Sequence, residues 1–465
     1  MKNRREEKEG EHEPGALPWA SGSTDVPKWR KLKLMSSKPR PIEHNRLAAH
    51  RLTTAATSPR ARITVLTGAR QTGKTTLVRR ALPDLAYISF DDPVTRAAWT
   101  RLSAADWVAR YPHAALAEVQ KAPGVIDTIK AAHDADPTVR YVLLGSSQIL
   151  LLDKVRESLA GRVALEEMWP LTLPERLTDG WDDPVRPSRL LRQLHQLVER
   201  GVADEAPLRG MPLTDKGFAL ARAAWATYLA WGGMPALADV RWSDTDRWEW
   251  LVDYRRTYLE RDVADLAALR DLEPFIRAQE CVALRTGQLL ETADLARAAK
   301  VAGPTAARFV RYLELSYQVL TLPPWFRNQE KRLQKRPKVH VVDPGILRSL
   351  TGRRGPLTGP EYESAVVAEV CKQLRSQRLP WRPYHLRTHD GREVDLLLEG
   401  EHGFVAMEIK ASDRVDGPDA RHLTDLETLL DRPLLARWVV SEDPDLRELK
   451  PGVVAVPAPW LLGPA

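Results

Sequence analysis

An eight-residue segment, GARQTGKT at Gly68–Thr75, constrains the fold of this 465-residue chain more than any other feature. It satisfies the pattern G-x-x-x-x-G-K-[ST], a β-branched run (RITVLTG) leads into it, and the helix-like KTTLVRRAL follows. The glycines let successive backbone N–H groups turn inward around a phosphate, and a helix N-terminus adds partial positive charge. We therefore expect a P-loop, with ATP and Mg²⁺ as its ligands.

The pattern also assigns roles within the loop. Lys74 would reach the β- and γ-phosphates, and the Thr75 hydroxyl would bind Mg²⁺. Farther along, YVLLGSSQ (141–148) predicts a buried strand whose end would place a polar sensor, Ser147 or Gln148, beside the γ-phosphate; an ordinary strand-ending turn is the alternative. Arg162 would offer its guanidinium fork to a phosphate. The residues expected at the nucleotide are Gly68, Ala69, Arg70, Gln71, Thr72, Gly73, Lys74, Thr75, Thr76, Ser147, Gln148 and Arg162.

A second acidic motif is expected where HAALAE (113–118) ends. Glu118 would orient the attacking water, and a surface position for it is the alternative. A nucleotide hydrolase usually ends this strand in Asp-Glu, the Asp supporting the metal, but Ala117 stands in that position here. Asp91 and Asp92, after the predicted strand LAYISF, are candidates to substitute in part. The missing carboxylate predicts slow hydrolysis and leaves nucleotide binding intact.

Composition excludes several classes of protein. The chain carries 69 Lys and Arg against 62 Asp and Glu, a net charge of +7 that leans only mildly toward an anionic partner. Its two cysteines lie far apart, so a disulfide framework and a zinc site are both disfavoured. No apolar stretch approaches the ~18 residues of a membrane span, and the charged N-terminus lacks a signal-peptide pattern. We expect a cytoplasmic protein without membrane contact.

The middle of the chain is basic. ETADLARAAKVAGPTAARFVRYLELS (291–316) predicts two short helices joined by VAGP, and Arg308 and Arg311 share one face of the second. RNQEKRLQKRPK (327–338) holds six cations and one acid, and on a wing or hairpin it would neutralise several phosphates of DNA or RNA. A solvated hairpin or a protein-docking face is the alternative. The expected contacts are Arg308, Arg311, Lys331, Arg332, Lys335 and Arg336.

A second group of carboxylates occurs in GREVDLLLEGEHGFVAMEIKAS (391–412). Asp395 opens one predicted strand, and Glu408 and Lys410 share a face of the next because residues two apart in a strand point the same way. Nucleases of the restriction-endonuclease type hold Mg²⁺ and activate water with such an Asp plus Glu-x-Lys set. Glu363, on an upstream helix, would add a third metal ligand. An edge-strand ion pair is the alternative.

Several motifs in order carry a family resemblance: Gly68–Thr75, AEVQKAP (117–123), LLGSSQILLL (143–152), ESLAGRV (157–163), WPLTLPE (169–175), GGMPA (232–236), YLERDV (258–263) and VVDPGILRSL (341–350). Over roughly residues 46–412 the chain resembles the bacterial and archaeal AAA-type ATPases that carry a C-terminal domain of unknown function, DUF4143. The resemblance implies an AAA-type P-loop domain, a helical and winged-helix middle, and a restriction-endonuclease-like C-terminal fold. Ala117 departs from the family as well.

The predicted fold class is therefore α/β: a P-loop AAA-type parallel sheet with helices on both faces, followed by the middle and C-terminal parts. The predicted domains are a flexible tail over 1–45, the P-loop domain over 46–175, a helical lid or linker over 176–285, a winged-helix-like region over 286–350, and the restriction-endonuclease-like domain over 351–465.

Two functions follow from these features. One is an ATP-binding AAA-type protein, slow in hydrolysis, whose nucleotide state controls a C-terminal nucleic-acid-processing module with Asp395, Glu408 and Lys410 as a metal-dependent nuclease site. The other is a nucleotide-gated regulatory or binding protein without cleavage, which Ala117 favours. A small-molecule kinase would leave the later half of the chain unexplained. A homo-oligomer, or a protein partner at the winged helix, is compatible with either function.

Overall fold

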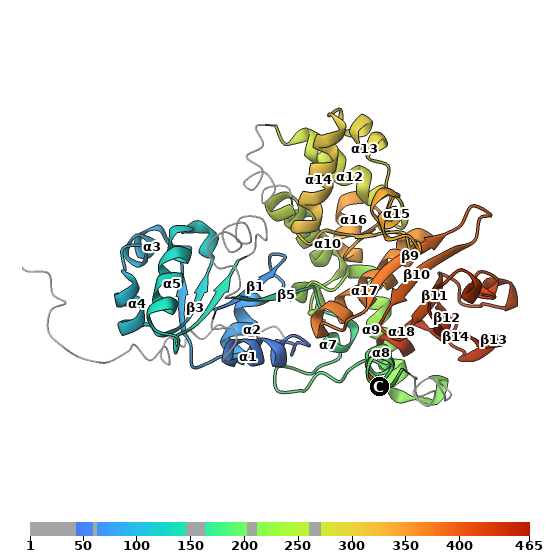
Figure 1. Ribbon diagram of the computed structural model, residues 1–465, viewed down its shortest axis with the longest axis horizontal. Helices are drawn as coiled ribbons and strands as arrows, with labels where there is room; N and C mark the ends of the chain where they lie inside the picture. The colour runs from blue at the N-terminus through green and yellow to red at the C-terminus, as the bar shows by residue number, and fades with distance from the viewer. Residues whose placement is uncertain (1–42, 59–62, 146–162, 202–211, 260–270) are drawn as a thin grey trace, which may run out of the picture. The chain divides into compact units, whose positions relative to one another are not determined.

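The structure is a computed structural model that describes residues 43–58, 63–145, 163–201, 212–259 and 271–465 (Figure 1). These residues belong to one compact unit, Ile42–Ala465. The predicted tail over 1–45 lies almost wholly outside the described residues. Ser147, Gln148 and Arg162 also lie outside them.

The phosphate-loop segment belongs to a five-stranded parallel sheet with the order β2-β3-β4-β1-β5. Its strands are β1 (Ile63–Gly68), β2 (Ala86–Ser89), β3 (His113–Ala117), β4 (Arg140–Leu144) and β5 (Val163–Met168). The predicted parallel α/β sheet is thus confirmed. Strand β5, at one edge, had no prediction from the sequence.

Helices cover both faces of this sheet because successive side chains of each buried strand point to opposite faces. They are α1 (Ala49–Thr57), α2 (Lys74–Ala81), α3 (Pro93–Trp99), α4 (Ala104–Arg110) and α5 (Gly124–Ala135). Ile63 and Val65 pack with the fully buried Trp107 of α4 and with the apolar side of α5. Leu66 and Ala117 pack on the other face, with α1 and α2.

The middle of the chain is mainly helical. Its helices are α7 (Leu173–Arg176), α8 (Arg189–Arg200), α9 (Lys216–Trp231), α10 (Asp244–Tyr254), α12 (Glu273–Leu284), α13 (Thr292–Ala299), α14 (Gly303–Leu315), α15 (Gln329–Gln334) and α16 (Pro344–Thr351). An antiparallel sheet of order β6-β8-β7 joins them, formed by β6 (Gln288–Leu289), β7 (Val319–Leu322) and β8 (Lys338–Val341). Helix α10 is continued by a π-helix at Arg255–Leu259, η5.

The basic segment 327–338 was expected on a wing or hairpin, and it lies in the connection between β7 and β8, two antiparallel neighbours of the three-stranded sheet. Residues Gln329–Gln334 form the short helix α15, which begins where the Asn328 side chain accepts a hydrogen bond from the Glu330 N–H at 2.9 Å. An N-cap of this kind satisfies a backbone donor that the first helical turn leaves open. The cations of this segment therefore lie on a short helix, on the residues that flank it and, in the case of Lys338, on strand β8.

The C-terminal part packs the long helix α17 (Gly359–Gln377) against a six-stranded mixed sheet of order β13-β14-β12-β11-β10-β9 (Figure 1). Its strands are β9 (Arg382–Arg387), β10 (Glu393–Glu399), β11 (Phe404–Lys410), β12 (Leu434–Ser441), β13 (Arg447–Lys450) and β14 (Val453–Pro457), and α18 (Ala458–Leu462) follows. Two 3₁₀ turns, η6 (Gly417–Ala420) and η7 (Leu426–Thr428), lie between β11 and β12.

A buried aspartate, Asp343, joins three of the family-like motifs. Its Oδ2 accepts a hydrogen bond from the Gly233 N–H at 2.6 Å, and a Cβ on Gly232 would lie 1.9 Å from its Oδ1. The Leu171 N–H in turn donates to the Gly233 carbonyl at 2.7 Å. The motifs WPLTLPE, GGMPA and VVDPGILRSL thus meet at one junction, where only glycine leaves room for the carboxylate.

Candidate nucleotide site and carboxylate cluster

The phosphate loop has the backbone geometry that its sequence predicts. Gln71 and Gly73 take left-handed conformations, with φ of 60° and 94°, and α2 begins at the next residue, Lys74. Residues that alternate between right-handed and left-handed conformations point successive backbone N–H groups into one concave anion site. The N-terminus of α2 adds partial positive charge to this site. Gly68 allows the backbone to pass Met168, since a Cβ there would lie 2.2 Å from the Met168 carbonyl oxygen. The loop therefore fits a nucleotide phosphate.

Two buried cations organise this loop. Lys74 Nζ donates to the carbonyls of Gly68 and Ala69, at 2.9 and 2.7 Å. Arg46, just ahead of α1, donates to the Thr72 carbonyl at 2.8 Å and pairs with Glu175 at 3.2 Å. Arg46 is buried and was missed by the sequence reasoning, since an arginine before the first strand carries no local signal of its position.

The carboxyl ends of the parallel strands bring the other predicted residues to the same edge of the sheet. Strand β4 lies between β1 and β3, so Gly145, where the predicted sensor segment starts, lies between the phosphate loop and Glu118. Glu118 has a left-handed backbone, with φ of 57°, and its Oε2 accepts from Gln120 Nε2 at 2.6 Å. The side of β3 that carries Ala117 faces α2, the helix that bears Thr75.

The two aspartates considered as substitutes for the missing carboxylate have other partners. Asp91 pairs with Lys121 at 2.6 Å, on the surface. Asp92 is the N-cap of α3, where it accepts from the N–H groups of Val94 and Thr95, and these hydrogen bonds lower its pKa. Both carboxylates therefore have structural roles in this arrangement.

Two tyrosines of the middle segment contact the start of the phosphate loop. The Tyr317 hydroxyl lies 2.6 Å from Oγ1 of Thr67, the residue before Gly68. The Tyr254 hydroxyl donates to the Arg70 carbonyl at 3.0 Å. The loop is thus in direct contact with α10 and with the turn between α14 and β7.

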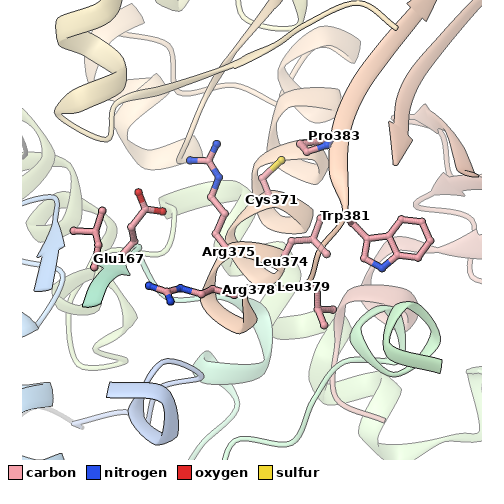
Figure 2. A pocket seen from close by; sticks show the side chains of 9 residues that line it. Glu167, Cys371, Leu374, Arg375, Arg378, Leu379, Trp381 and Pro383 are labelled. Atoms are coloured by element: carbon pink, nitrogen blue, oxygen red, sulfur yellow. The ribbon is translucent and has the colours of Figure 1, made fainter. Parts of the chain in front are cut away.

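A cavity of 390 Å³ lies between the edge strand β5 and helix α17 (Figure 2). Figure 2 shows Arg375 of α17, and Arg378 just after the end of this helix, extending toward the side of the cavity where Glu167 of β5 lies. Arg375 also lies over the Trp169 ring, at 5.1 Å, and Trp169 makes an edge contact with Tyr317 at 4.8 Å. Packed side chains therefore connect the phosphate-loop strand to α17.

The predicted carboxylates of the C-terminal part do converge, and a lysine occupies their centre. Lys338 Nζ, from β8, lies 2.9 Å from Glu363 Oε1, 2.6 Å from Glu393 Oε1 and 3.3 Å from Asp395 Oδ1. An ammonium group has three donors, and each faces one carboxylate here. We call Lys338, Glu363, Glu393, Asp395 and Glu408 the carboxylate cluster.

Burial dominates the electrostatics of this cluster. Burial and the neighbouring charge of Asp395 raise the pKa of Glu363 to about 8 and that of Glu408 to about 7. Burial alone would lower the pKa of Lys338, but the carboxylates around it raise that pKa above its ordinary value. The negative charge of the cluster is thus neutralised by Lys338, by protons bound to the carboxylates and by Lys410. The Lys410 Nζ lies 2.8 Å from Glu408 Oε1.

In this arrangement the Asp395 oxygens that a magnesium ion would need already have partners. Asp395 uses Oδ1 on Lys338, and its Oδ2 accepts from the Ile409 N–H at 2.9 Å. Across the described ranges, no group of three or more His, Cys, Asp or Glu side chains is placed to hold a metal ion. Lys338 and Glu393 were missed by the sequence reasoning, because Lys338 belongs to a strand far from the Glu-x-Lys motif and reads there as one more surface cation.

The predicted nucleic-acid contacts fall into separate places. Arg308 and Arg311 are exposed on α14. Lys331, Lys335 and Arg336 line a groove of 760 Å³. Arg332 lies inside the protein, where its guanidinium pairs with Glu399 at 3.0 Å, so it is not available to a phosphate.

Comparison with family models places three domains on the chain. An AAA domain matches residues 60–177, a domain of unknown function (DUF8612) matches 222–357, and a second domain of unknown function (DUF4143) matches 358–461. The uncharacterized proteins Rv2008c of Mycobacterium tuberculosis and Mb2031c of Mycobacterium bovis are each 30% identical over 416 residues, 87% of this chain and 81% of the relative. The chain belongs to this family of AAA-domain proteins with a C-terminal DUF4143 domain. The resemblance stated from the motifs is thereby confirmed.

Two solved structures are similar at lower identity. A Walker-type ATPase of Pyrococcus abyssi is 15% identical with a TM-score of 0.39, covering 67% of this chain and 99% of that one. A signal transduction ATPase with numerous domains from Pyrococcus horikoshii is 11% identical with a TM-score of 0.26, covering 73% and 47%. Separately, none of the helices within the described residues has the length and apolar character needed to cross a bilayer.

Proposed function

We propose that this AAA-domain protein is a slow ATP-driven switch, whose nucleotide state is passed through the middle segment to a C-terminal module that binds a partner without cutting it. The contacts of Tyr317 with Thr67 and of Tyr254 with the Arg70 carbonyl carry this proposal. They tie both sides of Gly68 to elements outside the nucleotide-binding sheet, so a phosphate-induced movement of the loop has a direct route outward.

The site residues act as follows in this proposal. Lys74 exchanges the Gly68 and Ala69 carbonyls for the β- and γ-phosphates, while backbone N–H groups of the loop bind the same oxygens. The Thr75 hydroxyl, now 3.3 Å from the Tyr87 hydroxyl, would hold Mg²⁺. Magnesium would neutralise the charge that develops on the phosphates. Glu118 orients water, and hydrolysis is slow because Ala117 offers no carboxylate.

The finer fold assignments belong to the same proposal. The succession of α12, α13 and α14 with the β6-β8-β7 sheet supports a winged helix in the middle segment. Helix α17 and the mixed sheet support a restriction-endonuclease-like C-terminal part. The Lys338 ammonium at the centre of the carboxylate cluster favours binding over cleavage, since it takes up the oxygens that a catalytic metal needs.

Nucleotide titration and turnover test this function. A fluorescent ATP analogue in magnesium buffer should bind saturably to the full chain, and Lys74→Ala should abolish binding. Lys121→Ala, which removes an exposed surface lysine, is the matched control and should bind as the wild type does. A wild-type chain without saturable binding would overturn the proposal.

A metal-dependent nuclease is the second candidate, and one observation favours it. Asp395, Glu408 and Lys410 lie together on neighbouring strands, as the motif predicts. Incubation of labelled single-stranded and duplex DNA and RNA with Mg²⁺ or Mn²⁺ tests this candidate. It requires cleavage by the wild type that Asp395→Asn abolishes; equal background in the two proteins removes it.

A further inference from the structure

The cationic groove is a hollow of 760 Å³ formed by α15, by the segment before it and by strand β9. Five cations line it, and none of the described lining residues carries a carboxylate. The chain as a whole is nearly balanced, with 69 basic and 62 acidic residues, so this concentration of one sign is local. The lining cations are Arg327, Lys331, Lys335, Arg336 and Arg387.

Three of these cations are available to a ligand. Lys331 and Lys335 are exposed, and neither has an ion-pair partner among the residues that the structure describes. Arg387 comes from β9 and is half-exposed, and its one ion-pair contact within the described residues is a long one, 4.0 Å to Glu393. Arg327 and Arg336 are engaged: Arg327 donates to three main-chain carbonyls near the end of η7, and Arg336 pairs with Glu291.

Contacts on the protein-facing side of the groove fix its shape. The Trp325 N–H donates to the His385 carbonyl at 2.7 Å, which fixes the segment before α15 to β9. The buried guanidinium of Arg332 lies 5.1 Å from the Trp325 ring and pairs with Glu399. Phe326, next to Trp325, lines the groove and stays partly exposed. Because these contacts already order the wall that carries the aromatic ring and the cations, little conformational entropy is lost there when a ligand binds.

We propose that this groove binds single-stranded nucleic acid, with phosphates at Lys331, Lys335 and Arg387 and a base stacked on Phe326. A cationic groove combined with an aromatic platform is the chemistry that recognises an unpaired strand. A duplex keeps its bases stacked inside and cannot offer one to Phe326, and an acidic peptide would leave the ring unused. The proposal goes beyond the ATP switch, since it does not depend on nucleotide binding.

Fluorescence anisotropy with labelled oligo(dT) and oligo(U), titrated with the full chain over a range of NaCl concentrations, tests the groove. The triple variant Lys331→Glu/Lys335→Glu/Arg387→Glu should bind at least tenfold more weakly. Its plot of log affinity against log salt should be shallower by about 2, at ~0.7 per lost phosphate contact. Phe326→Ala should weaken binding about tenfold, as loss of one stacking platform does.

The exposed pair Arg308→Glu/Arg311→Glu on α14 is the contrast, because it reverses the charge of two exposed cations that lie outside the groove. It should bind within about twofold of the wild type. Retained affinity in the triple variant, or loss in the α14 pair alone, overturns the proposal. Tighter binding to duplex than to single strands, or equal competition by polyglutamate, overturns the assignment of the ligand. Thermal melting of each variant confirms that these surface changes leave the fold intact.

Discussion

The Tyr317 hydroxyl lies 2.6 Å from Oγ1 of Thr67, the residue that precedes the first glycine of the phosphate loop. Tyr317 is almost fully buried and has a left-handed backbone, with φ of 61°, which costs a non-glycine residue about 1–3 kcal/mol. Packing must hold it there, and its edge contact with Trp169 is part of that packing. The protein thus maintains a strained residue in order to place one hydroxyl at the nucleotide loop.

Replacing this hydroxyl tests the link. Tyr317→Phe keeps the ring and removes the hydrogen bond, so we expect a loss of about 1 kcal/mol in unfolding free energy. We also expect ATP to alter hydrogen exchange over 312–322 in the wild type and much less in the variant. Tyr312→Phe, a partly buried tyrosine of α14, is the control. An identical ATP response in Tyr317→Phe and the wild type would contradict a role for this contact in transmission.

The nucleotide-binding part of the fold was predictable because its signals are local. Short apolar runs marked β1, β2, β3 and β4 close to their observed bounds, and the phosphate loop reads directly from eight consecutive residues. Helix α17 and strands β10 and β11 were predicted for the same reason. Sequence reasoning succeeds where one segment carries the whole pattern.

The role of a residue was not predictable from the sequence where it depends on a partner far away in the chain. Lys338 appears in a run of surface-like cations, yet it is the buried centre of carboxylates that come from α17 and β10. Arg332 belongs to the same run of cations, but it is buried, where it forms an ion pair with Glu399. Likewise, nothing local in GGMPA shows that Gly232 leaves room for the carboxylate of Asp343, a residue of another motif.

The Asp343 junction predicts an intolerance of side chains at Gly232. Its φ of 81° and the 1.9 Å approach of a Cβ to Asp343 Oδ1 both oppose alanine. We expect Gly232→Ala to destabilise the protein by about 3 kcal/mol or more, through backbone strain and displacement of a buried carboxylate. Gly355→Ala, where a Cβ meets nothing within 4 Å, is the control and should stay near wild type. The unfolding free energies of the two variants, measured by urea unfolding and compared with that of the wild type, test this prediction.

The carboxylate cluster predicts a fall in stability as the pH rises from about 6.5 to 8. Burial raises the pKa of Glu363 to about 8, so the folded protein keeps a proton that the unfolded chain has already released. Because the unfolded state binds fewer protons in this window, unfolding free energy decreases with pH. Below about pH 6.5, the lowered pKa values of buried His340 and His385 have the opposite effect. The unfolded chain binds protons there that these folded histidines do not, so the unfolding free energy rises with pH through them.

Urea unfolding at several pH values checks this expectation. Glu363→Gln cannot titrate, so its unfolding free energy should change much less between pH 6.5 and 8. Glu330→Gln, on the surface of α15, should keep the wild-type profile. A wild-type stability that stays level or rises across the window would show that Glu363 is ionised throughout.

Removing the central ammonium should be costly. Lys338→Met leaves the buried carboxylates of Glu363, Glu393 and Asp395 without their shared cation, and the expected loss is about 3–5 kcal/mol. Lys335→Met, three residues earlier and exposed, should change stability by no more than about 0.5 kcal/mol. If Mn²⁺ stabilises Lys338→Met but not the wild type, the carboxylates accept a metal once the lysine is gone. A small loss in Lys338→Met would show that the ammonium contributes little.

Restoring the missing carboxylate should speed ATP hydrolysis. Ala117 ends β3 on the face that packs against α2, which carries Thr75, so Ala117→Asp would place a second acidic group on the magnesium side of the sheet. We expect turnover to rise several-fold, because an added carboxylate supports the ion that neutralises developing charge on the phosphates. Ala115→Asp, on the same face but deeper in the strand, is the control, which buries the same charge without reaching the loop and should only destabilise the protein. Equal, unraised turnover in both variants would mean that Ala117 does not limit the reaction, and that its slowness has another cause.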